Sequence, residues 1–275
     1  MTSKGFLSMT VSFSKKVIHP FLSIITVAHN AVTTIDKTIE SVRSQKLELY
    51  EHIIIDGAST DGTIQVIESH EGTYPLRWVS EPDSGIANAM NKGIKLSKGR
   101  YILMLHADDR LGDSESLQKV FRHLYNEKHD IYAAPILMEY LNGMQILHKP
   151  NHFLWWYHFK TPFCHQGTIV HRRVFDHIGL FNESYAIAMD YDFFYRALKI
   201  HPSIIYQKLP LSVMGAYGVG TRQDIALKRI DEEYRVQTKN ETNPIWRLIQ
   251  FLFRMAYLPY KKLTLNHLSQ IGTDK

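Results

Sequence analysis

Cysteine is nearly absent from this sequence of 275 residues, which contains only Cys164. One cysteine permits neither an internal disulfide nor a zinc site built from cysteines, and this composition suits a reducing, cytoplasmic compartment. We interpret Cys164 as a small buried apolar residue, because an isolated cysteine more often packs in a core than acts as a nucleophile.

Long apolar runs are also missing. No uninterrupted apolar stretch approaches the ~20 residues that a membrane-spanning helix needs. Residues 1–20 carry a short apolar patch, but Lys15 and Lys16 follow it and no small-residue cleavage site is present. We therefore expect this segment to be a loose leader and not a signal peptide.

The signatures of several other classes of protein are absent as well. The sequence contains neither Gly-x-Gly-x-x-Gly nor Gly-x-x-x-x-Gly-Lys-Ser/Thr, which disfavours a dinucleotide-binding Rossmann site and a P-loop. The formal net charge of +5 fits an acidic ligand, an anionic membrane or nucleic acid, and selects none of them. Because the basic residues are spread along the chain without a nucleic-acid-binding signature, no nucleic acid partner is expected.

What the sequence does contain is a repeated order of strand, polar turn and helix before residue 125. Four apolar stretches are predicted to be strands: Leu22–Ala28, His52–Ile55, Leu76–Val79 and Tyr101–Leu105. Apolar residues at helical spacing lie between them, and this is the βαβ order of a doubly wound, mostly parallel α/β sheet. With 44% hydrophobic residues, the chain can form one large domain, or one domain with an appendage.

Carboxylates stand where three of the predicted strands end. Asp56 follows the second strand, Asp83 lies in the turn after the third, and Asp108 and Asp109 follow the fourth. Ligands of open α/β sheets bind outside the carboxyl ends of the strands, so these side chains are expected to converge on one site. Adjacent carboxylates repel each other unless a cation lies between them, and a divalent metal that carries substrate phosphates is a common solution. The alternative is an ordinary turn or helix cap, where Asp is frequent.

Four segments in this order resemble glycosyltransferase family 2, and within it the bacterial branch that builds capsule, O-antigen and exopolysaccharide repeat units. The segments are SIITVAHN (23–30), IIDGASTDGT (54–63), SEPDSGIANAMNKG (80–93) and LHADD (105–109). The similarity covers about residues 21–215. Each motif alone is weak, but four at natural spacing make the resemblance specific.

The resemblance implies the GT-A fold, a Rossmann-like sheet with a mixed acceptor-side half and a helical C-terminal tail. It also implies a nucleotide-diphospho-sugar donor, a divalent metal (Mn²⁺ or Mg²⁺), a saccharide acceptor that is lipid-linked in this branch, and inversion at the anomeric carbon. Residues 21–125 are then expected to bind the donor and residues 126–215 the acceptor, while residues 216–275 form a loop and helical tail.

The strand-end residues receive roles from the same resemblance. Asp109 matches the aspartate that helps to hold the metal on the donor diphosphate, with Asp108 in support. Asp56 matches an aspartate beside the nucleoside. The family often has a second aspartate next to it, and here that position is Gly57, which leaves the donor nucleotide open.

Two further residues before the fourth strand, Asp83 and Lys92, match positions that are typical of this branch and are expected at the donor. For Lys92 the alternative is an exposed helix cation.

In the second half, Asp190 matches the catalytic base of the family at the start of a helix, although the acid that usually precedes it is Met189 here. The alternative for Asp190 is a helix cap. Asp192 is not expected to face the site together with Asp190, because successive helical side chains point about 100° apart. His165, with Gln166, matches a recurrent pair of the branch and is expected near the acceptor; the alternative is a hydrogen-bonded structural histidine.

Other segments of the second half have less specific patterns. Residues 130–138 and 144–148 are predicted to be the strands of a hairpin. The aromatic stretch 151–159 is expected to cover the sheet, with a sugar-stacking face as the alternative. The Gly-rich loop 215–222 ends in Arg222, which could meet phosphate if the loop closes over the donor; a plain connector is the alternative.

The C-terminal tail contains a charged helix at 223–239 and an apolar helix with cations at 245–258. The second helix suits a membrane interface, which would associate the protein with the inner face of the plasma membrane. The alternative is packing on the core or on a second subunit.

Two rival functions fit parts of the pattern. A nucleotidyltransferase would use the same metal, but residues 29–31 lack the Gly-rich phosphate loop that would favour it. A binding or scaffold protein could keep the fold without turnover. Loss of the acidic pair or of the base would favour that function, and both are present.

Overall fold

The computed structural model describes residues 19–126, 129–216 and 225–271, with side chains as far as residue 262. Most of the predicted leader, and Arg222 with its loop from residue 217, lie outside the described residues.

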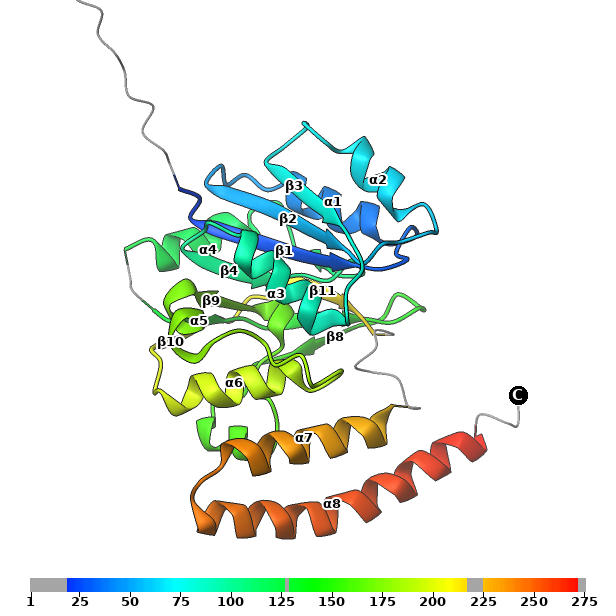
Figure 1. Ribbon diagram of the computed structural model, residues 1–275, viewed down its shortest axis with the longest axis vertical. Helices are drawn as coiled ribbons and strands as arrows, with labels where there is room; N and C mark the ends of the chain where they lie inside the picture. The colour runs from blue at the N-terminus through cyan, green and yellow to red at the C-terminus, as the bar shows by residue number, and fades with distance from the viewer. Residues whose placement is uncertain (1–18, 127–128, 217–224, 272–275) are drawn as a thin grey trace, which may run out of the picture.

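The first half of the chain alternates strands and helices as predicted (Figure 1). Its elements are β1 Leu22–Ala28, α1 Ile35–Arg43, β2 Tyr50–Asp56, α2 Thr63–Ser69, β3 Leu76–Ser80, α3 Ile86–Leu96 and β4 Tyr101–Met104. Strands β1, β2 and β4 are buried along their whole length, which explains the apolar runs within them, although β1 and β2 also bury polar side chains such as Ser23, Glu51 and His52.

These strands join three later ones in a seven-stranded sheet with the order β10–β6–β9–β4–β1–β2–β3. The later strands are β6 Ile131–Ala133, β9 Thr168–His171 and β10 Ile204–Tyr206. Strand β9 runs antiparallel to β4 and β6, whereas the other pairs are parallel. The prediction of a mostly parallel sheet with a mixed second half is confirmed.

A second, four-stranded sheet has the order β5–β11–β7–β8. Its strands are β5 Arg110–Leu111, β7 Ile136–Glu139, β8 Gln145–His148 and β11 Ser212–Gly215. The predicted hairpin is confirmed by the antiparallel pair β7–β8. The prediction of one strand over 130–138 is wrong, because the chain leaves the first sheet after Ala133 and enters the second at Ile136. Pro135 lies at this break, where its lack of an N–H prevents a continuous ladder.

Alternate side chains of the strands feed an apolar core on each face of the large sheet. Ile25 and Ile102 pack with α3, α5 Arg172–Ile178 and α6 Met189–Lys199, whereas Ile24 and Leu103 pack with α1 and α4 Ser116–Leu124. Helices on both faces leave the carboxyl ends of the parallel strands as the place where loops meet.

The C-terminal part forms two helices, α7 Ala226–Asn240 and α8 Pro244–Ile271, at the lower end of Figure 1. Helix α7 packs on α6, and α8 packs on α7. Both predicted helices are confirmed, but α8 continues through Pro259 beyond its predicted end. Within the described part of the chain, no helix has both the length and the apolar character needed to cross a membrane.

Candidate active site

The end of β2 is held by Asp56, whose side chain is fully buried. Its Oδ2 accepts hydrogen bonds from the Ser59 N–H at 2.9 Å and the Ser80 hydroxyl at 2.7 Å, and its Oδ1 accepts one from the Ser59 hydroxyl at 2.5 Å. The carboxylate therefore fixes the turn after β2 against the end of β3. Its predicted contact with the nucleoside stays a prediction.

Asp83 brings a second carboxylate to the end of β2. Its Oδ1 accepts a hydrogen bond from the Gly85 N–H at 2.8 Å, and its Oδ2 would lie 2.4 Å from a Cβ added at Gly57. The His29 ring also borders this space, because its Nδ1 lies 2.9 Å from the Gly57 carbonyl oxygen. The Asp83 carboxylate thus occupies the space that a side chain at position 57 would need, where the family often has an aspartate.

Lys92 supports the loop that carries Asp83. Its Nζ pairs with Glu81 Oε1 at 2.7 Å and donates a hydrogen bond to the Pro82 carbonyl at 2.8 Å. The side chain is partly buried, so it is not the exposed helix cation of the alternative. Its predicted contact with the donor stays a prediction.

The two carboxylates after β4 have different surroundings. Asp109 is 1% exposed, and its Oδ2 accepts a hydrogen bond from the His106 N–H at 3.0 Å. Burial raises the pKa of Asp109 well above its usual range, the charge of Asp108 adds to the shift, and the His106 N–H and the Gln166 side chain oppose it. Asp108 reaches solvent beside Gly215. A nearby cation would therefore keep Asp109 ionised.

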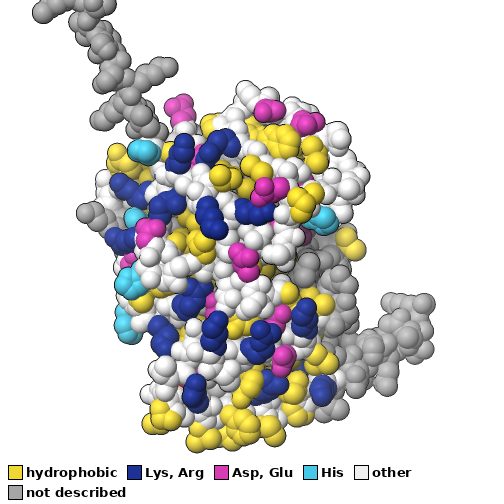
Figure 2. Space-filling view, viewed as in Figure 1, with side chains coloured by type: hydrophobic (Ala, Val, Ile, Leu, Met, Phe, Trp, Pro, Cys, Tyr) yellow, Lys and Arg dark blue, Asp and Glu magenta, His cyan; other side chains and the backbone are white. Residues whose placement is uncertain are grey.

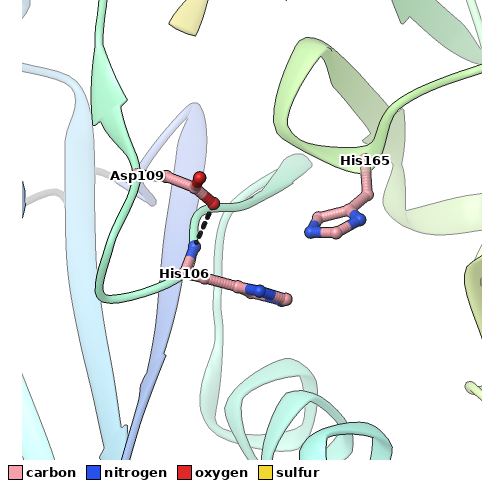
Figure 3. A group of neighbouring side chains, drawn as sticks. All are labelled: His106, Asp109 and His165. Atoms are coloured by element: carbon pink, nitrogen blue, oxygen red, sulfur yellow. Dashed lines mark hydrogen bonds between the residues drawn. The ribbon is translucent and has the colours of Figure 1, made fainter. Parts of the chain in front are cut away.

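His106, Asp109 and His165 form one cluster across the two halves of the chain (Figure 3). His165 lies in the 3-10 turn η2 His165–Gly167, and its ring centre is 4.5 Å from that of His106. One ligand atom from each of the three residues lies within 4.8 Å of the others. Asp109 Oδ1 and the Nε2 atoms of both histidines are buried without a hydrogen-bond partner. This donor set fits the divalent metal that the family implies.

Asp190 lies beside this cluster in the first turn of α6. Its Oδ2 is 3.9 Å from His165 Nδ1, and its Oδ1 accepts a hydrogen bond from the Tyr191 N–H at 2.6 Å. Asp192, in contrast, is buried and paired with Arg196 at 2.8 Å. The expectation that the two carboxylates do not face the site together is confirmed.

One supporting residue was not found by sequence reasoning. Glu232 of α7 is buried, and its carboxylate accepts hydrogen bonds from the N–H groups of Ala186, Ile187 and Ala188 at 3.2, 2.8 and 3.0 Å. It therefore fixes the backbone directly before α6. Glu232 lies in a charged helical stretch, and nothing in that pattern distinguishes it from its neighbours.

His106 was also missed, although its place between an apolar strand and an acidic pair was a usable signal. Cys164 is partly buried and not fully buried as expected, and burial raises the pKa of its thiol to about 12, which disfavours the thiolate. The aromatic stretch contains the 3-10 segment η1 Leu154–His158, which packs on α6 and α8. His152 of the same stretch packs on Tyr206 of the edge strand β10, with ring centres 4.1 Å apart, so the stretch covers the sheet at this edge while η1 packs on helices.

The sequence model of glycosyl transferase family 2 matches residues 23–186, and the chain belongs to this family. A PGL/p-HBAD biosynthesis glycosyltransferase of Mycobacterium bovis is 26% identical over 242 residues, which cover 86% of this chain and 90% of that protein. The chondroitin synthase of Escherichia coli is 26% identical over 193 residues, which cover 66% of this chain and 27% of that protein.

Solved structures place the fold in the GT-A type. A mannosyltransferase of Pyrobaculum calidifontis in complex with GDP-Man and Mn²⁺ has a TM-score of 0.66 at 15% identity, over 94% of this chain and 77% of that one. TarS of S. aureus, residues 1–349 in complex with UDP, has a TM-score of 0.65 at 17% identity, over 86% of this chain and 72% of that one. The chain is thus a family 2 glycosyltransferase with a GT-A fold.

Proposed function

We propose that this glycosyltransferase is metal-dependent and inverting, and that it moves a sugar from a nucleotide-diphospho-sugar to a hydroxyl of a saccharide acceptor. The observation that carries the proposal is the distance of 3.9 Å between Asp190 and His165, because His165 also belongs to the cluster with Asp109. A base and a metal-binding carboxylate therefore meet in one site. The structural neighbours support a donor of this class, since they were solved with GDP-Man and Mn²⁺ or with UDP.

Asp190 has the role of general base. It accepts the proton of the acceptor hydroxyl as that oxygen attacks the anomeric carbon from the face opposite the diphosphate. Glu232 keeps the backbone before Asp190 in place, so that the carboxylate stays oriented toward the acceptor. A bound divalent metal supplies positive charge for the leaving diphosphate.

The donor lies along the ends of β1, β2 and β4 in residues 21–125. Asp56 and Asp83 border the nucleoside, and Lys92 holds the loop that carries Asp83. Asp108 lies on the diphosphate side of the site, and His165, which was expected near the acceptor, lies between Asp109 and the base Asp190, where donor and acceptor meet. The acceptor binds on the side of the site formed by residues 126–215, which contain the base Asp190.

We also propose that the acceptor is lipid-linked and that α8 contacts an anionic membrane from the cytoplasmic side. Apolar side chains gather along the lower edge of the molecule, with Lys and Arg above them (Figure 2). On α8, four apolar side chains are exposed at a spacing that places them on one side of the helix: Ile245, Leu248, Leu252 and Met255 at 67, 59, 56 and 60%.

The charge of the same helix and its aromatic neighbours favour a lipid surface over a second copy of the chain. Lys262 is exposed on α8, where anionic headgroups would meet it, whereas the guanidinium of the exposed Arg247 donates hydrogen bonds to the Glu241 and Thr238 carbonyls. The adjoining segment before and within η1 adds exposed aromatic side chains, Phe153 at 68% and Trp155 at 52%. Cations beside apolar and aromatic side chains are typical of helices that lie in a membrane interface.

Replacement of Asp190 by Asn tests the proposed mechanism. Asp190→Asn should lower the rate of sugar transfer by about 100-fold or more, since the amide cannot take up a proton, while donor binding stays unchanged. The rate is measured with a lipid-linked saccharide acceptor, and donor binding by calorimetry. Asp176→Asn, at an exposed position of α5, is the matched control and should keep the parental rate. A rate of Asp190→Asn within a few-fold of the parent would show that Asp190 is not the base.

A further inference from the structure

The cluster of His106, Asp109 and His165 contains an unusual concentration of unsatisfied polar atoms. Among the described residues, six buried side-chain nitrogen or oxygen atoms lack a hydrogen-bond partner, and three of these six belong to this cluster. Buried polar atoms are normally paired, because leaving one unpaired costs about 1–3 kcal/mol. The three residues each have a ligand atom within 4.8 Å of those of the other two, and together with the unpartnered atoms this indicates that a ligand belongs between the side chains.

All three atoms are acceptors that suit a cation. A neutral imidazole can offer the lone pair of its Nε2 atom to a cation. Asp109 offers the free carboxylate oxygen. The three side chains come from the loop after β4 and from η2, and the Asp109 carboxylate is fixed by the His106 N–H. The ligand atoms are therefore positioned before any ion arrives.

We propose that His106 Nε2, Asp109 Oδ1 and His165 Nε2 hold the divalent cation directly, and that the two imidazoles make the site prefer a transition metal such as Mn²⁺ over Mg²⁺. The proposal deepens the function proposed above, because the same cation would then meet the donor diphosphate. It extends the metal site beyond the acidic pair to two histidines, one from each half of the chain.

The preference follows from the chemistry of the ligands. Mg²⁺ is a hard cation that takes oxygen ligands and keeps several of its waters. Imidazole nitrogen is a softer ligand that binds first-row transition metals more tightly than Mg²⁺. Three protein ligands also leave coordination positions for oxygens of a diphosphate.

The test is a titration of the full chain with Mn²⁺ alone, followed by electron paramagnetic resonance of free Mn²⁺, with Mg²⁺ added as competitor. We expect one bound Mn²⁺ that a large excess of Mg²⁺ does not displace. His165→Ala and His106→Ala should each weaken Mn²⁺ binding by at least about tenfold, as loss of even a supporting residue does in metal sites. His177→Ala, at an exposed position of α5, is the matched control and should bind like the parent.

A conservative variant separates loss of a ligand from loss of the fold. His165→Gln replaces the nitrogen ligand by an amide oxygen, so it should keep a cation site but lose much of the preference for Mn²⁺ over Mg²⁺. The ligand set is wrong if both alanine variants of the histidines bind Mn²⁺ like the parent. It is also wrong if Mg²⁺ competes for the site as strongly as Mn²⁺ does.

This titration contains no nucleotide, so its outcome is independent of the proposed function. Sugar transfer without the predicted Mn²⁺ binding would refute the ligand set and leave the transferase intact. Tight Mn²⁺ binding without binding of any nucleotide sugar would support the ligand set and refute the proposed function.

Discussion

The carboxylate of Asp83 fills the space that any side chain at position 57 would need. A Cβ at Gly57 would lie 2.4 Å from Asp83 Oδ2 and 3.2 Å from His29 Nδ1. The nearest obstacle is the end of a side chain and not backbone, so a methyl group at position 57 would move the carboxylate instead of disrupting the strand. A substitution at Gly57 therefore displaces the Asp83 carboxylate while residue 83 itself stays an aspartate.

Gly57→Ala should therefore weaken donor binding by about tenfold, the equivalent of one hydrogen bond to a charged group. The displaced Asp83 carboxylate would no longer lie beside the nucleoside, whereas the fold would be kept. Calorimetric titration with the nucleotide sugar that binds the parent protein measures the effect, and thermal unfolding checks the fold.

A double-mutant cycle provides the control. If Gly57→Ala acts through Asp83, it should have no further effect on donor binding in an Asp83→Ala background. Equal effects in both backgrounds would mean that position 57 acts independently of Asp83.

For single residues, the local sequence pattern was sufficient to predict that Asp190 and Asp192 point in different directions. It was not sufficient to predict the more distant residues that contact the site. Helical geometry alone predicts that one of the two carboxylates turns away, and Asp192 does so by pairing with Arg196. Glu232 could not be predicted, because its contact with residue 188 joins positions 44 apart that share no periodic pattern. His106 directly follows a predicted strand, but its place in the cluster depends on the ring of His165 from a distant turn.

At the scale of elements, helix α8 has two different faces. One face packs on the protein, where Trp246 stacks on His158 at 3.9 Å and Gln250 donates a hydrogen bond to the His158 carbonyl. The opposite face carries exposed apolar side chains that include Leu252 and Met255. The packed face keeps the helix in place, so changes on the exposed face should leave the fold intact.

We predict that the full chain binds vesicles containing anionic lipid, and that Leu252→Glu with Met255→Glu lowers this binding by at least about tenfold. Burial of one such side chain contributes about 1.5–3 kcal/mol, and the added charges would be repelled by the lipid. Co-sedimentation with vesicles measures the bound fraction.

The control is an equally drastic change at exposed apolar residues elsewhere, Leu141→Glu with Leu209→Glu, which should not change vesicle binding. Equal losses in both pairs, or binding that is insensitive to salt and to anionic lipid, would contradict a membrane role for α8.

Sequence periodicity predicted the positions of the strands and helices better than it predicted which strands pair with each other. The strands β1 to β4 and helix α6 stand where apolar spacing indicates them, because that spacing reflects burial of the same chain segment. The break between β6 and β7 was not predicted, since both segments are apolar and their separation depends on which sheet each one joins. The antiparallel insertion of β9 between β4 and β6 likewise follows from distant pairing and not from its own residues.

At the scale of the whole molecule, the large sheet joins the donor half to the acceptor half. Strand β4 of the first half pairs directly with β9 of the second. This pairing sets the loop that carries Asp109 beside the turn that carries His165, and α6 then brings Asp190 within 3.9 Å of His165. The candidate site therefore exists only when both halves are folded together.

The central claim is that this combined site binds a nucleotide sugar through a divalent metal. Calorimetric titration of the full chain with UDP-, GDP-, dTDP- and CMP-sugars, each with and without Mn²⁺, tests it most directly. The account predicts that one nucleotide class binds at micromolar concentration in the presence of Mn²⁺ and not in its absence. Folded protein that binds none of these sugars, or that binds one equally well without metal, would contradict it.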